Sequence, residues 1–152
     1  MDSRTIPHVL ALTAPYWEAA RDRRLCLQRC AVCGLYVHFP QLECPRCANT
    51  ELPYEQVSGR GVVHTFSIVH RTFAPGFAAR VPYVIAWIEL VEQAGLRVFG
   101  NVLHCPPEQV CIGMPVELCF EDLDGFGPIP NFRAVPEEAL NAPLPVAGRR
   151  TP

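Results

Sequence analysis

Two pairs of cysteines near the start of the chain limit its possible folds more than any other feature. Cys30 and Cys33 form one CxxC pair, Cys44 and Cys47 form a second, and ten residues separate the pairs. A two-residue gap lets both thiolates of a pair point at one ion, and two pairs complete the tetrahedral sulfur shell that Zn²⁺ accepts. Gly34 follows the first pair, where a residue without a Cβ can turn tightly and aim N–H groups at sulfur. The spacing predicts a ribbon around one metal ion.

Four cysteine ligands leave no open coordination position, so we expect the metal to be structural, and Zn²⁺ is the expected ion. Tetrahedral sulfur also suits iron, which would make the chain an electron carrier of the rubredoxin type. Unligated or disulfide-bonded thiols are the other alternative, but no secretion signal accompanies the cysteines. Four further cysteines lie among apolar residues and are expected to be small buried side chains; these are Cys26, Cys105, Cys111 and Cys119.

Composition favours an ordinary β-rich domain. Hydrophobic residues make up 49% of the 152 residues, which is enough for a core, and the 16 prolines and 10 glycines disfavour a helical bundle. No apolar run reaches the roughly 18 residues that span a bilayer. The first twelve residues lack the apolar stretch and the cleavage site of a signal peptide. We therefore expect a cytoplasmic protein with no membrane partner.

The order of the elements predicts a specific β fold. We expect a short helix from Thr13 to Arg24, with Thr13 as its cap and Pro15 in its first turn, and a strand from Leu35 to Phe39 in the ribbon. Beyond the ribbon the hydrophobic pattern changes to period two, which is typical of strands. The expected strands are Gly61 to His70, Tyr83 to Leu90, Leu96 to Leu103, Pro115 to Phe120, and a short one near Asn131 to Val135. A helical turn from Pro106 to Ile112, closed by Gly113, lies between the third and fourth strands, as in an OB-fold.

The predicted fold is therefore mainly β, with an N-terminal helix and a rubredoxin-like zinc ribbon followed by a five-stranded OB-fold barrel. The expected divisions are 1–24 for the arm and helix, 25–57 for the ribbon, 58–135 for the barrel and 136–152 for an extended or disordered tail. The segment from Tyr83 to Ile88 is apolar on both faces. We therefore expect the ribbon, a helix or another chain to cover its outer face.

Motifs spread over residues 15 to 134 carry a resemblance to a known family. They are Tyr16-Trp17-Glu18, Leu27 to Cys30, Cys33-Gly34, Phe39-Pro40, Cys44 to Cys47, Ser58 to Gly61, Val69 to Arg71, Ala74 to Phe77, Val81 to Tyr83, Gly100-Asn101, Ile112 to Val116 and Phe132-Arg133. The CxxC pairs alone are generic, whereas the ordered set is specific. The chain resembles the zinc-ribbon and OB-fold proteins associated with acyl-CoA, known as domain of unknown function number thirty-five. It departs from that family at Ala134, where proline is common.

The resemblance implies a partner. Proteins of this family are typically small subunits or fused domains of thiolase-superfamily enzymes, including thiolases, ketoacyl-type acyltransferases and steroid side-chain aldolases. The catalytic Cys and His then belong to the thiolase-like chain, which this chain stabilises while helping to form the channel for the CoA thioester. A two-plus-two heterotetramer is the stoichiometry expected by analogy. The residues agree with a non-catalytic subunit, because no nucleophile–base–orienter set is evident. The acyl group and the reaction stay open.

The expected working surface is the loop from His70 to Pro82, which is rich in Pro, Gly and aromatic residues. Arginine forks suit CoA phosphates, and aromatic rings can line a pantetheine path. The candidate residues for the CoA or partner channel are His70, Arg71, Phe73, Phe77 and Arg80. Solvated surface is an equal alternative for the two arginines, and loop-anchoring core is an alternative for the two phenylalanines.

Single-stranded nucleic-acid binding is the alternative function, because OB-folds and zinc ribbons both serve it. Such proteins combine a positive groove with stacking aromatic residues. This chain has a net charge of -2, and Tyr83 and Trp87 lie in apolar contexts that indicate core. Charge therefore disfavours nucleic acid as a partner.

Overall fold

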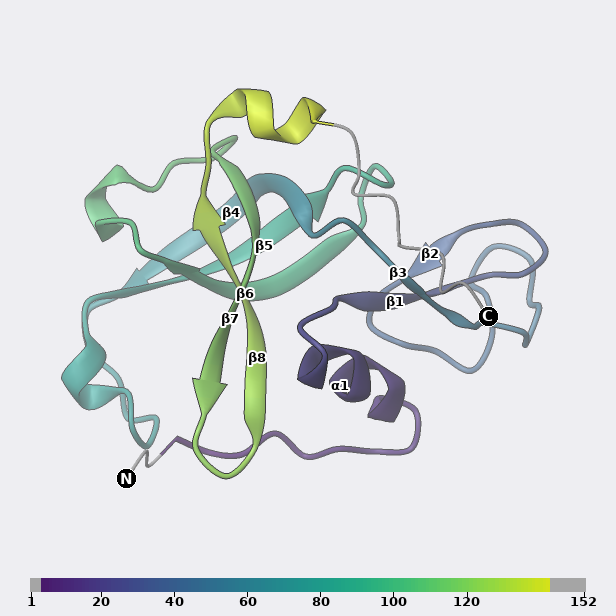
Figure 1. The fold of residues 1–152 in the computed structure, drawn as a ribbon, viewed down its shortest axis with the longest axis horizontal. Coiled ribbons are helices and arrows are strands. Elements are labelled where there is room, and N and C mark those ends of the chain that lie inside the picture. Colours follow the sequence, from purple (N-terminus) through teal and green to yellow (C-terminus); the bar gives the residue numbers. More distant parts are fainter. Residues whose placement is uncertain (1–3, 143–152) are drawn as a thin grey trace, which may run out of the picture.

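A computed structural model describes residues 4–142 of the chain, and Figure 1 shows its arrangement. One helix, a small sheet and a barrel follow one another along the sequence. The elements are α1 (Ala14–Arg21), β1 (Cys26–Arg29), β2 (Tyr36–Val37), β3 (Tyr54–Gln56), β4 (Arg60–Val69), η1 (Ala78–Arg80), β5 (Tyr83–Leu90), β6 (Arg97–Leu103), η2 (Pro107–Gln109), β7 (Pro115–Leu123), β8 (Gly127–Ala134) and η3 (Glu137–Asn141). Within residues 4–142, no helix is both long and apolar enough to cross a membrane.

Helix α1 is shorter than the segment that the sequence predicts. It ends at Arg21 because Arg23 takes a positive φ of 54°, and the N–H groups of Arg23 and Arg24 donate to Ala20 and Ala19. This is the geometry of a helix that is closed by one left-handed residue. Pro15 lies in the first turn as expected, but Thr13 does not cap the helix with its side chain. Its hydroxyl instead accepts a hydrogen bond from the Leu10 N–H at 3.0 Å.

The ribbon is a three-stranded antiparallel sheet in the order β2-β1-β3. Strand β1 pairs with β2 through Gln28 and Val37, and with β3 through Leu27 and Glu55. The predicted strand from Leu35 to Phe39 is only two residues long, and β1 and β3 are not among the strands predicted from the sequence. Figure 1 shows this sheet beside the barrel, with α1 between the ribbon and the β7–β8 hairpin.

The second part is the predicted five-stranded OB-fold. Its strands close in the order β4-β5-β6-β8-β7, in which all neighbours are antiparallel except β6 and β8. β4 and β5 pair from Gly61 and Leu90 to Val69 and Tyr83, with a bulge between Val63 and Thr65. The prediction of five strands with a helical turn between the third and fourth is confirmed, since η2 lies between β6 and β7. The fifth strand is longer than expected and begins at Gly127.

One hydrophobic cluster joins the ribbon to the barrel. Leu25, Leu27 and Val57 of the ribbon region share it with barrel residues such as Ile88 and Phe132. Burial of this apolar surface is the main favourable term that holds the two parts together. Because these ribbon residues are buried in the same cluster as the barrel core, and Tyr16 of α1 packs against that cluster, the three parts share one hydrophobic core.

Two polar side chains of the β5–β6 turn add to this connection. The Gln93 side chain accepts a hydrogen bond from the Tyr36 N–H at 2.9 Å and donates one to the Tyr36 carbonyl at 3.2 Å. It therefore extends β2 much as a neighbouring strand would. The Ser58 N–H donates to the Glu92 carboxylate. Both contacts hold the ribbon against the barrel at the end of β5.

The segment predicted as an extended or disordered tail begins with ordered structure. Residues 137–141 form η3, and the Arg60 guanidinium donates to the Ala139 carbonyl at 3.0 Å and to the Ala142 carbonyl. This buried arginine explains the order of a segment without periodicity, since it supplies donors for the exposed carbonyls. Residues 143–152 of the predicted tail lie outside the described part of the chain.

Candidate functional site

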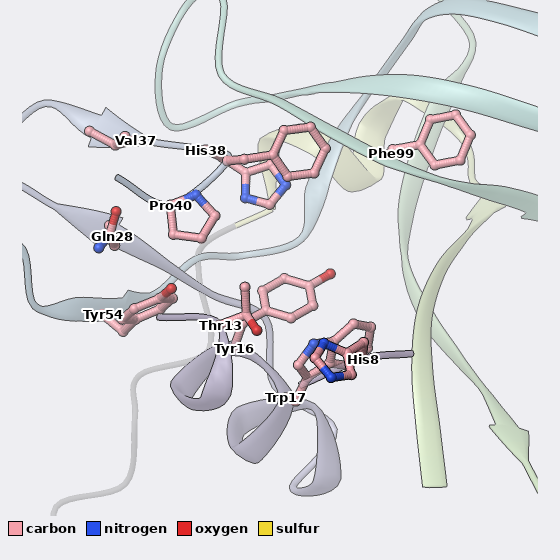
Figure 2. A pocket seen from close by; sticks show the side chains of 11 residues that line it. His8, Thr13, Tyr16, Trp17, Gln28, Val37, His38, Pro40, Tyr54 and Phe99 are labelled. Atoms are coloured by element: carbon pink, nitrogen blue, oxygen red, sulfur yellow. The ribbon is translucent and has the colours of Figure 1, made fainter. Parts of the chain in front are cut away.

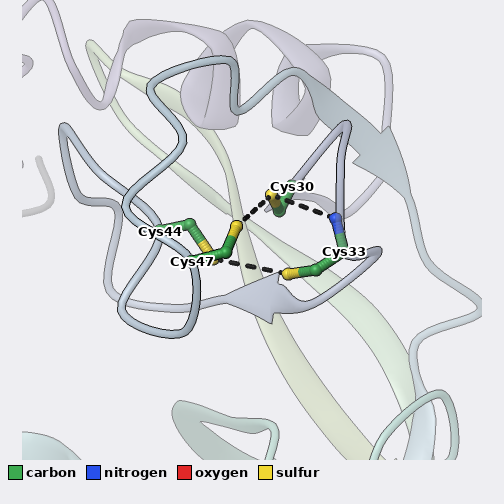
Figure 3. Close-up of side chains that lie close together, drawn as sticks. All are labelled: Cys30, Cys33, Cys44 and Cys47. Atoms are coloured by element: carbon green, nitrogen blue, oxygen red, sulfur yellow. Dashed lines mark hydrogen bonds between the residues drawn. The ribbon is translucent and has the colours of Figure 1, made fainter.

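The four cysteines of the two CxxC pairs come together, as Figure 3 shows. Their sulfur atoms all lie within 4.8 Å of one another, and the Cys30–Cys47 and Cys33–Cys44 sulfur pairs are 3.5 and 3.6 Å apart. Zn–S bonds of about 2.3 Å in a tetrahedron place sulfur atoms roughly 3.8 Å apart. The cluster therefore matches the size of a site for one tetrahedral zinc ion.

Two tight turns aim these sulfur atoms. Gly34 has a φ of 70° and Ala48 a φ of 58°, and their N–H groups donate to the carbonyls of Cys30 and Cys44, both at 2.9 Å. The turn was predicted to aim N–H groups at sulfur. The N–H that does so belongs to Cys33, the residue before Gly34, and it donates to the Cys30 sulfur at 3.5 Å. This bond is the largest of several hydrogen bonds that together lower the pKa of the Cys30 thiol to about 6. A thiolate at neutral pH is the form that binds metal.

Asn49 contributes to the zinc site although it is not among the residues predicted from the sequence. Its side-chain amide donates to the Cys30 sulfur at 3.6 Å and to the Glu51 carbonyl at 2.9 Å. Hydrogen bonds of this kind orient a metal ligand and spread its charge. Its position two residues after Cys47 was the available signal.

The remaining cysteines differ in exposure. Cys26 is buried, and Cys105 and Cys119 are partly buried, as expected of small apolar side chains. Cys111 is exposed, so the expectation that it is buried is wrong. It follows η2 in the short connection to β7, where the chain turns at the surface. None of the four lies in the sulfur cluster.

The loop from His70 to Pro82 divides into an anchored half and an exposed half. Phe77 packs against Tyr83 with ring centroids 5.1 Å apart, and the guanidinium groups of Arg4 and Arg80 lie over its ring at 6.0 and 5.8 Å. Arg80 also forms an ion pair with Glu121 of β7. Among the candidate channel residues, Phe77 and Arg80 therefore hold the loop to the barrel.

The other three candidates project into solvent. His70 and Arg71 are exposed, and Phe73 is the most exposed large apolar side chain in the described chain. Arg71 forms no ion pair within residues 4–142, whereas Arg80 does. The structure thus brings Phe77 and Arg80 together and leaves His70, Arg71 and Phe73 available at one end of the barrel.

Three aromatic rings form an exposed patch where the ribbon meets the barrel. Trp87 of β5 contacts Phe39 of the ribbon and Phe99 of β6, with ring centroids 5.9 and 5.3 Å apart. Phe39 is 61% exposed and Phe99 is 45% exposed, while Trp87 is half-buried. The ribbon thus covers only part of the outer face of β5. We refer to Phe39, Trp87 and Phe99 as the aromatic patch.

A pocket of about 310 Å³ opens beside the aromatic patch (Figure 2). The N-terminal arm, α1, the ribbon and β6 all contribute to its walls. The lining residues are His8, Thr13, Tyr16, Trp17, Gln28, Val37, His38, Phe39, Pro40, Tyr54 and Phe99. The Tyr16 and His38 rings stack with centroids 6.0 Å apart, and Trp17 packs edge-on against Phe126 of the β7–β8 turn.

His38 should make the stability of the fold depend on pH. Burial lowers its pKa from 6.5 to about 4, and the pocket lining holds no Asp, Glu or Arg that would offset this. The unfolded chain therefore binds more protons than the folded chain between these values, and the free energy of unfolding falls as pH drops below 6.5. We expect a loss on the order of 2 kcal/mol between pH 7 and pH 5. Urea unfolding of the zinc-loaded protein at both pH values measures it.

His38→Phe isolates this effect. The variant keeps an aromatic ring at the position but cannot bind a proton, so the other four histidines and the cysteines contribute equally to both proteins. The stability difference between wild type and variant should shift in favour of the variant as pH falls from 7 to 5. If the free energies of unfolding of the two proteins changed with pH by the same amount, the folded state would not lower the pKa of His38.

Comparison with known proteins places the chain in a family. Residues 17–53 match the family model described as "ChsH2, rubredoxin-like zinc ribbon domain", and residues 54–121 match "ChsH2, C-terminal OB-fold domain". A "DUF35 domain-containing scaffold protein" of Methanocaldococcus jannaschii is 46% identical over 73% of this chain and 78% of its own length. The chain belongs to the ChsH2/DUF35 family. The predicted resemblance is therefore confirmed.

Relatives of this ChsH2/DUF35 protein include parts of larger chains. A "Probable enoyl-CoA hydratase alpha subunit" of Thermomonospora curvata is 37% identical over 89% of this chain but only 41% of that subunit. A "3-oxo-4,17-pregnadiene-20-carboxyl-CoA hydratase alpha subunit" of Mycobacterium tuberculosis is 36% identical over 72% of this chain and 34% of that subunit. This chain thus spans well under half the length of both hydratase subunits.

Solved structures support the same assignment. A chain of the "Ltp2-ChsH2(DUF35) aldolase" superposes with a TM-score of 0.77 at 35% identity, covering 84% of this chain and 98% of the other. A DUF35 protein of unknown function from Sulfolobus solfataricus shares the fold, with a TM-score of 0.56 at 12% identity. Together with the sulfur geometry, the match to a zinc-ribbon family identifies Cys30, Cys33, Cys44 and Cys47 as a structural zinc site.

Proposed function

We propose that this ChsH2/DUF35 protein is a non-catalytic, zinc-binding subunit of a thiolase-superfamily enzyme that acts on acyl-CoA. In this role it stabilises the catalytic chain and contributes to the channel for the CoA thioester. Relatives named as hydratase alpha subunits, as part of an aldolase and as scaffold proteins support a role beside an acyl-CoA enzyme. The proposal extends that role to a thiolase-like partner, in a cytoplasmic assembly of two copies of each chain.

The aromatic patch is the observation that carries the proposal. Phe39, Trp87 and Phe99 form contiguous apolar surface with no covering element in the described chain. Exposed aromatic residues that touch one another are typical of surfaces that bury against a protein partner, and Trp and Phe are common anchors there. A partner on this patch would complete the cover of β5 that its two-sided apolar sequence requires.

The exposed half of the His70–Pro82 loop supports the second element of the proposal. Phe73 offers an apolar ring and Arg71 an available guanidinium at the end of the barrel. Arginine binds phosphate through two parallel N–H donors, which matches the phosphates of CoA. Because Arg80 is already paired with Glu121, we assign the phosphate contact to Arg71 and the anchoring of the loop to Arg80 and Phe77.

Phe39→Asp should weaken binding of the catalytic chain by at least about tenfold, which corresponds to about 1.4 kcal/mol. The substitution places a charge in the centre of an apolar contact, while Phe39 is exposed enough that the fold should survive. Biolayer interferometry with the catalytic chain recovered from the native source measures the affinity. Leu42→Asp is the matched control, because Leu42 lies in the same ribbon loop and is 76% exposed. If both variants bound the catalytic chain with equal affinity, the aromatic patch would not be part of the interface.

Arg71→Ala should raise the KM of the assembled enzyme for its acyl-CoA about tenfold and leave kcat nearly unchanged. The substitution removes a charge-assisted hydrogen bond to phosphate that is equally strong in the ground and transition states. Steady-state kinetics of the reconstituted complex measure both constants. Arg46→Ala, which removes an exposed arginine beside the zinc site, is the control for net charge. An unchanged KM in Arg71→Ala would exclude Arg71 from the channel.

Single-stranded nucleic-acid binding is the second candidate, and one observation favours it. The outer faces of β5 and β6 carry Trp87 and Phe99, and these two strands form the usual oligonucleotide surface of an OB-fold. Electrostatics argue against it: Arg97 beside them pairs with Glu89, and the chain carries a net charge of -2. Salt-dependent binding of a fluorescent oligonucleotide, measured by anisotropy, would favour this alternative.

A further inference from the structure

The pocket beside the aromatic patch is assembled from four separate parts of the chain. His8 comes from the arm, Tyr16 and Trp17 from α1, His38 from the ribbon and Phe99 from β6 (Figure 2). Its volume of about 310 Å³ is at the small end of the range for ligand pockets, about 300–1,000 Å³. A molecule of one or two rings matches this size.

The lining sets the charge of a suitable ligand. The eleven lining residues include no Asp, Glu, Lys or Arg. Burial keeps the His38 imidazole uncharged above pH 4 and raises the pKa of the Tyr16 phenol, so both stay neutral at physiological pH. A charged ligand would lose its hydration here, and the lining holds no Asp, Glu, Lys or Arg side chain to pair with it. The pocket therefore selects against carboxylates and against phosphates such as those of CoA.

The pocket nevertheless offers specific hydrogen bonds. Within the described chain, no group hydrogen-bonds to the Tyr16 hydroxyl or to the His38 imidazole. Their rings stack beside one another and both residues line the pocket, so they form one wall of it. A hydroxyl or carbonyl group on a ligand can pair with them, while Trp17, Phe39 and Phe99 contact its apolar body.

We propose that this pocket binds an uncharged one- or two-ring molecule that carries a single hydroxyl or carbonyl group. Tyr16 and His38 form its polar wall, and the aromatic side chains of α1, the ribbon and β6 form its apolar walls. The site is separate from the zinc cluster and from the His70–Pro82 loop, because it shares no residue with either. The pocket shares Phe39 and Phe99 with the aromatic patch, but its test uses the chain without a partner and so does not depend on the proposed acyl-CoA enzyme.

A matched pair of probes tests the charge requirement. 2-Naphthol is an uncharged two-ring molecule with one hydroxyl group at pH 7, and 2-naphthoate has the same rings with a carboxylate. Isothermal titration calorimetry of the full zinc-loaded chain should show one 2-naphthol per chain, bound at least tenfold more tightly than 2-naphthoate. Equal binding of the two probes, or no binding of 2-naphthol, would overturn the proposal. The second result is also expected if the pocket instead receives a side chain of a protein partner.

Two nearly isosteric variants test whether 2-naphthol binds beside Tyr16 and His38. Tyr16→Phe and His38→Phe each remove one polar group and keep a ring, so each should lower the affinity for 2-naphthol about three- to tenfold. Neither should change the affinity for naphthalene, which has no hydroxyl group. Tyr83→Phe is the control, since Tyr83 lies on β5 outside the pocket. Bound zinc and the thermal midpoint verify that each variant is folded. Unchanged 2-naphthol binding in both variants would place the probe elsewhere and overturn the proposal.

Discussion

A chain carrying Cys44→Ser is expected to bind zinc more than a hundredfold more weakly than the wild type and to lose the folded ribbon. Structural zinc sites contribute about 10–16 kcal/mol of binding free energy that is coupled to folding. The ribbon strands contain only four, two and three residues, so they cannot replace this contribution by themselves. Cys44 is buried in the sulfur cluster, and a serine hydroxyl is a poor ligand in its place.

Zinc content and hydrogen exchange measure this result directly. Inductively coupled plasma mass spectrometry should find one zinc per wild-type chain and little in the variant, and residues 25–57 should lose exchange protection. The barrel should also be destabilised, because Leu25, Leu27 and Val57 belong to its hydrophobic cluster. Cys111→Ser is the matched control, since Cys111 is exposed and outside the sulfur cluster. Full zinc occupancy and a protected ribbon in Cys44→Ser would refute the assignment of Cys44 as a ligand.

Phe132→Ala should lower the free energy of unfolding by about 3–5 kcal/mol, the usual cost of removing a buried phenylalanine. Phe132 has 0% exposure and lies on β8, which closes the barrel by pairing with β6 and β7. Gly100 of β6 faces its ring so closely that a Cβ there would lie 3.0 Å from the Phe132 Cδ2 atom. Because this space is shaped for one aromatic ring, the variant should retain a cavity.

Urea unfolding of the zinc-loaded protein, followed by circular dichroism, measures this loss. A loss of 3–5 kcal/mol is a large part of the roughly 5–15 kcal/mol that stabilises an ordinary domain. Phe73→Ala is the control, because this phenylalanine is fully exposed and its removal should change stability by less than about 0.5 kcal/mol. If both variants unfolded at the same urea concentration, Phe132 would not be central to the core.

The sequence predicts the barrel well where the period-two pattern is uninterrupted. The predicted strand from Tyr83 to Leu90 matches β5 at both ends. Strand β4 differs from its prediction by one residue at each end, and β6 begins one residue later than predicted. The first half of β8 was not predicted from the sequence, because it contains Pro128 and Pro130 and proline cannot donate a ladder hydrogen bond. Pairing with the whole of β7 nevertheless holds these residues extended.

Short elements that depend on distant contacts could not be predicted. Strands β1 and β3 are stabilised by pairing across 25 or more residues and by the metal site between them, which local pattern does not report. The helix ends early, at Arg21, because Arg23 takes a left-handed conformation that its residue type does not signal. The order of η3 depends on Arg60, almost eighty residues earlier in the chain.

The candidate site divides in the same way. The zinc ligands were predictable because metal geometry imposes a local spacing that is visible in the sequence. The aromatic patch was not, because Phe39 comes from the ribbon and meets Trp87 and Phe99 of the β5–β6 pair only after the two parts pack together. Trp87 was expected in the core from its apolar neighbours, whereas the structure leaves it half-buried within this patch. The pocket likewise exists only after the arm, α1, the ribbon and β6 are packed together.

Recovery of the protein with its natural partners tests the proposed function most directly. The chain would be tagged in its native source and purified gently, and the co-purifying proteins would be identified and quantified by mass spectrometry. We predict a stoichiometric thiolase-superfamily chain that carries its own catalytic Cys and His, and whose recovery falls when Phe39→Asp replaces the wild type. Recovery of the wild-type chain alone, loaded with zinc but without a partner, would contradict the proposed role as a subunit.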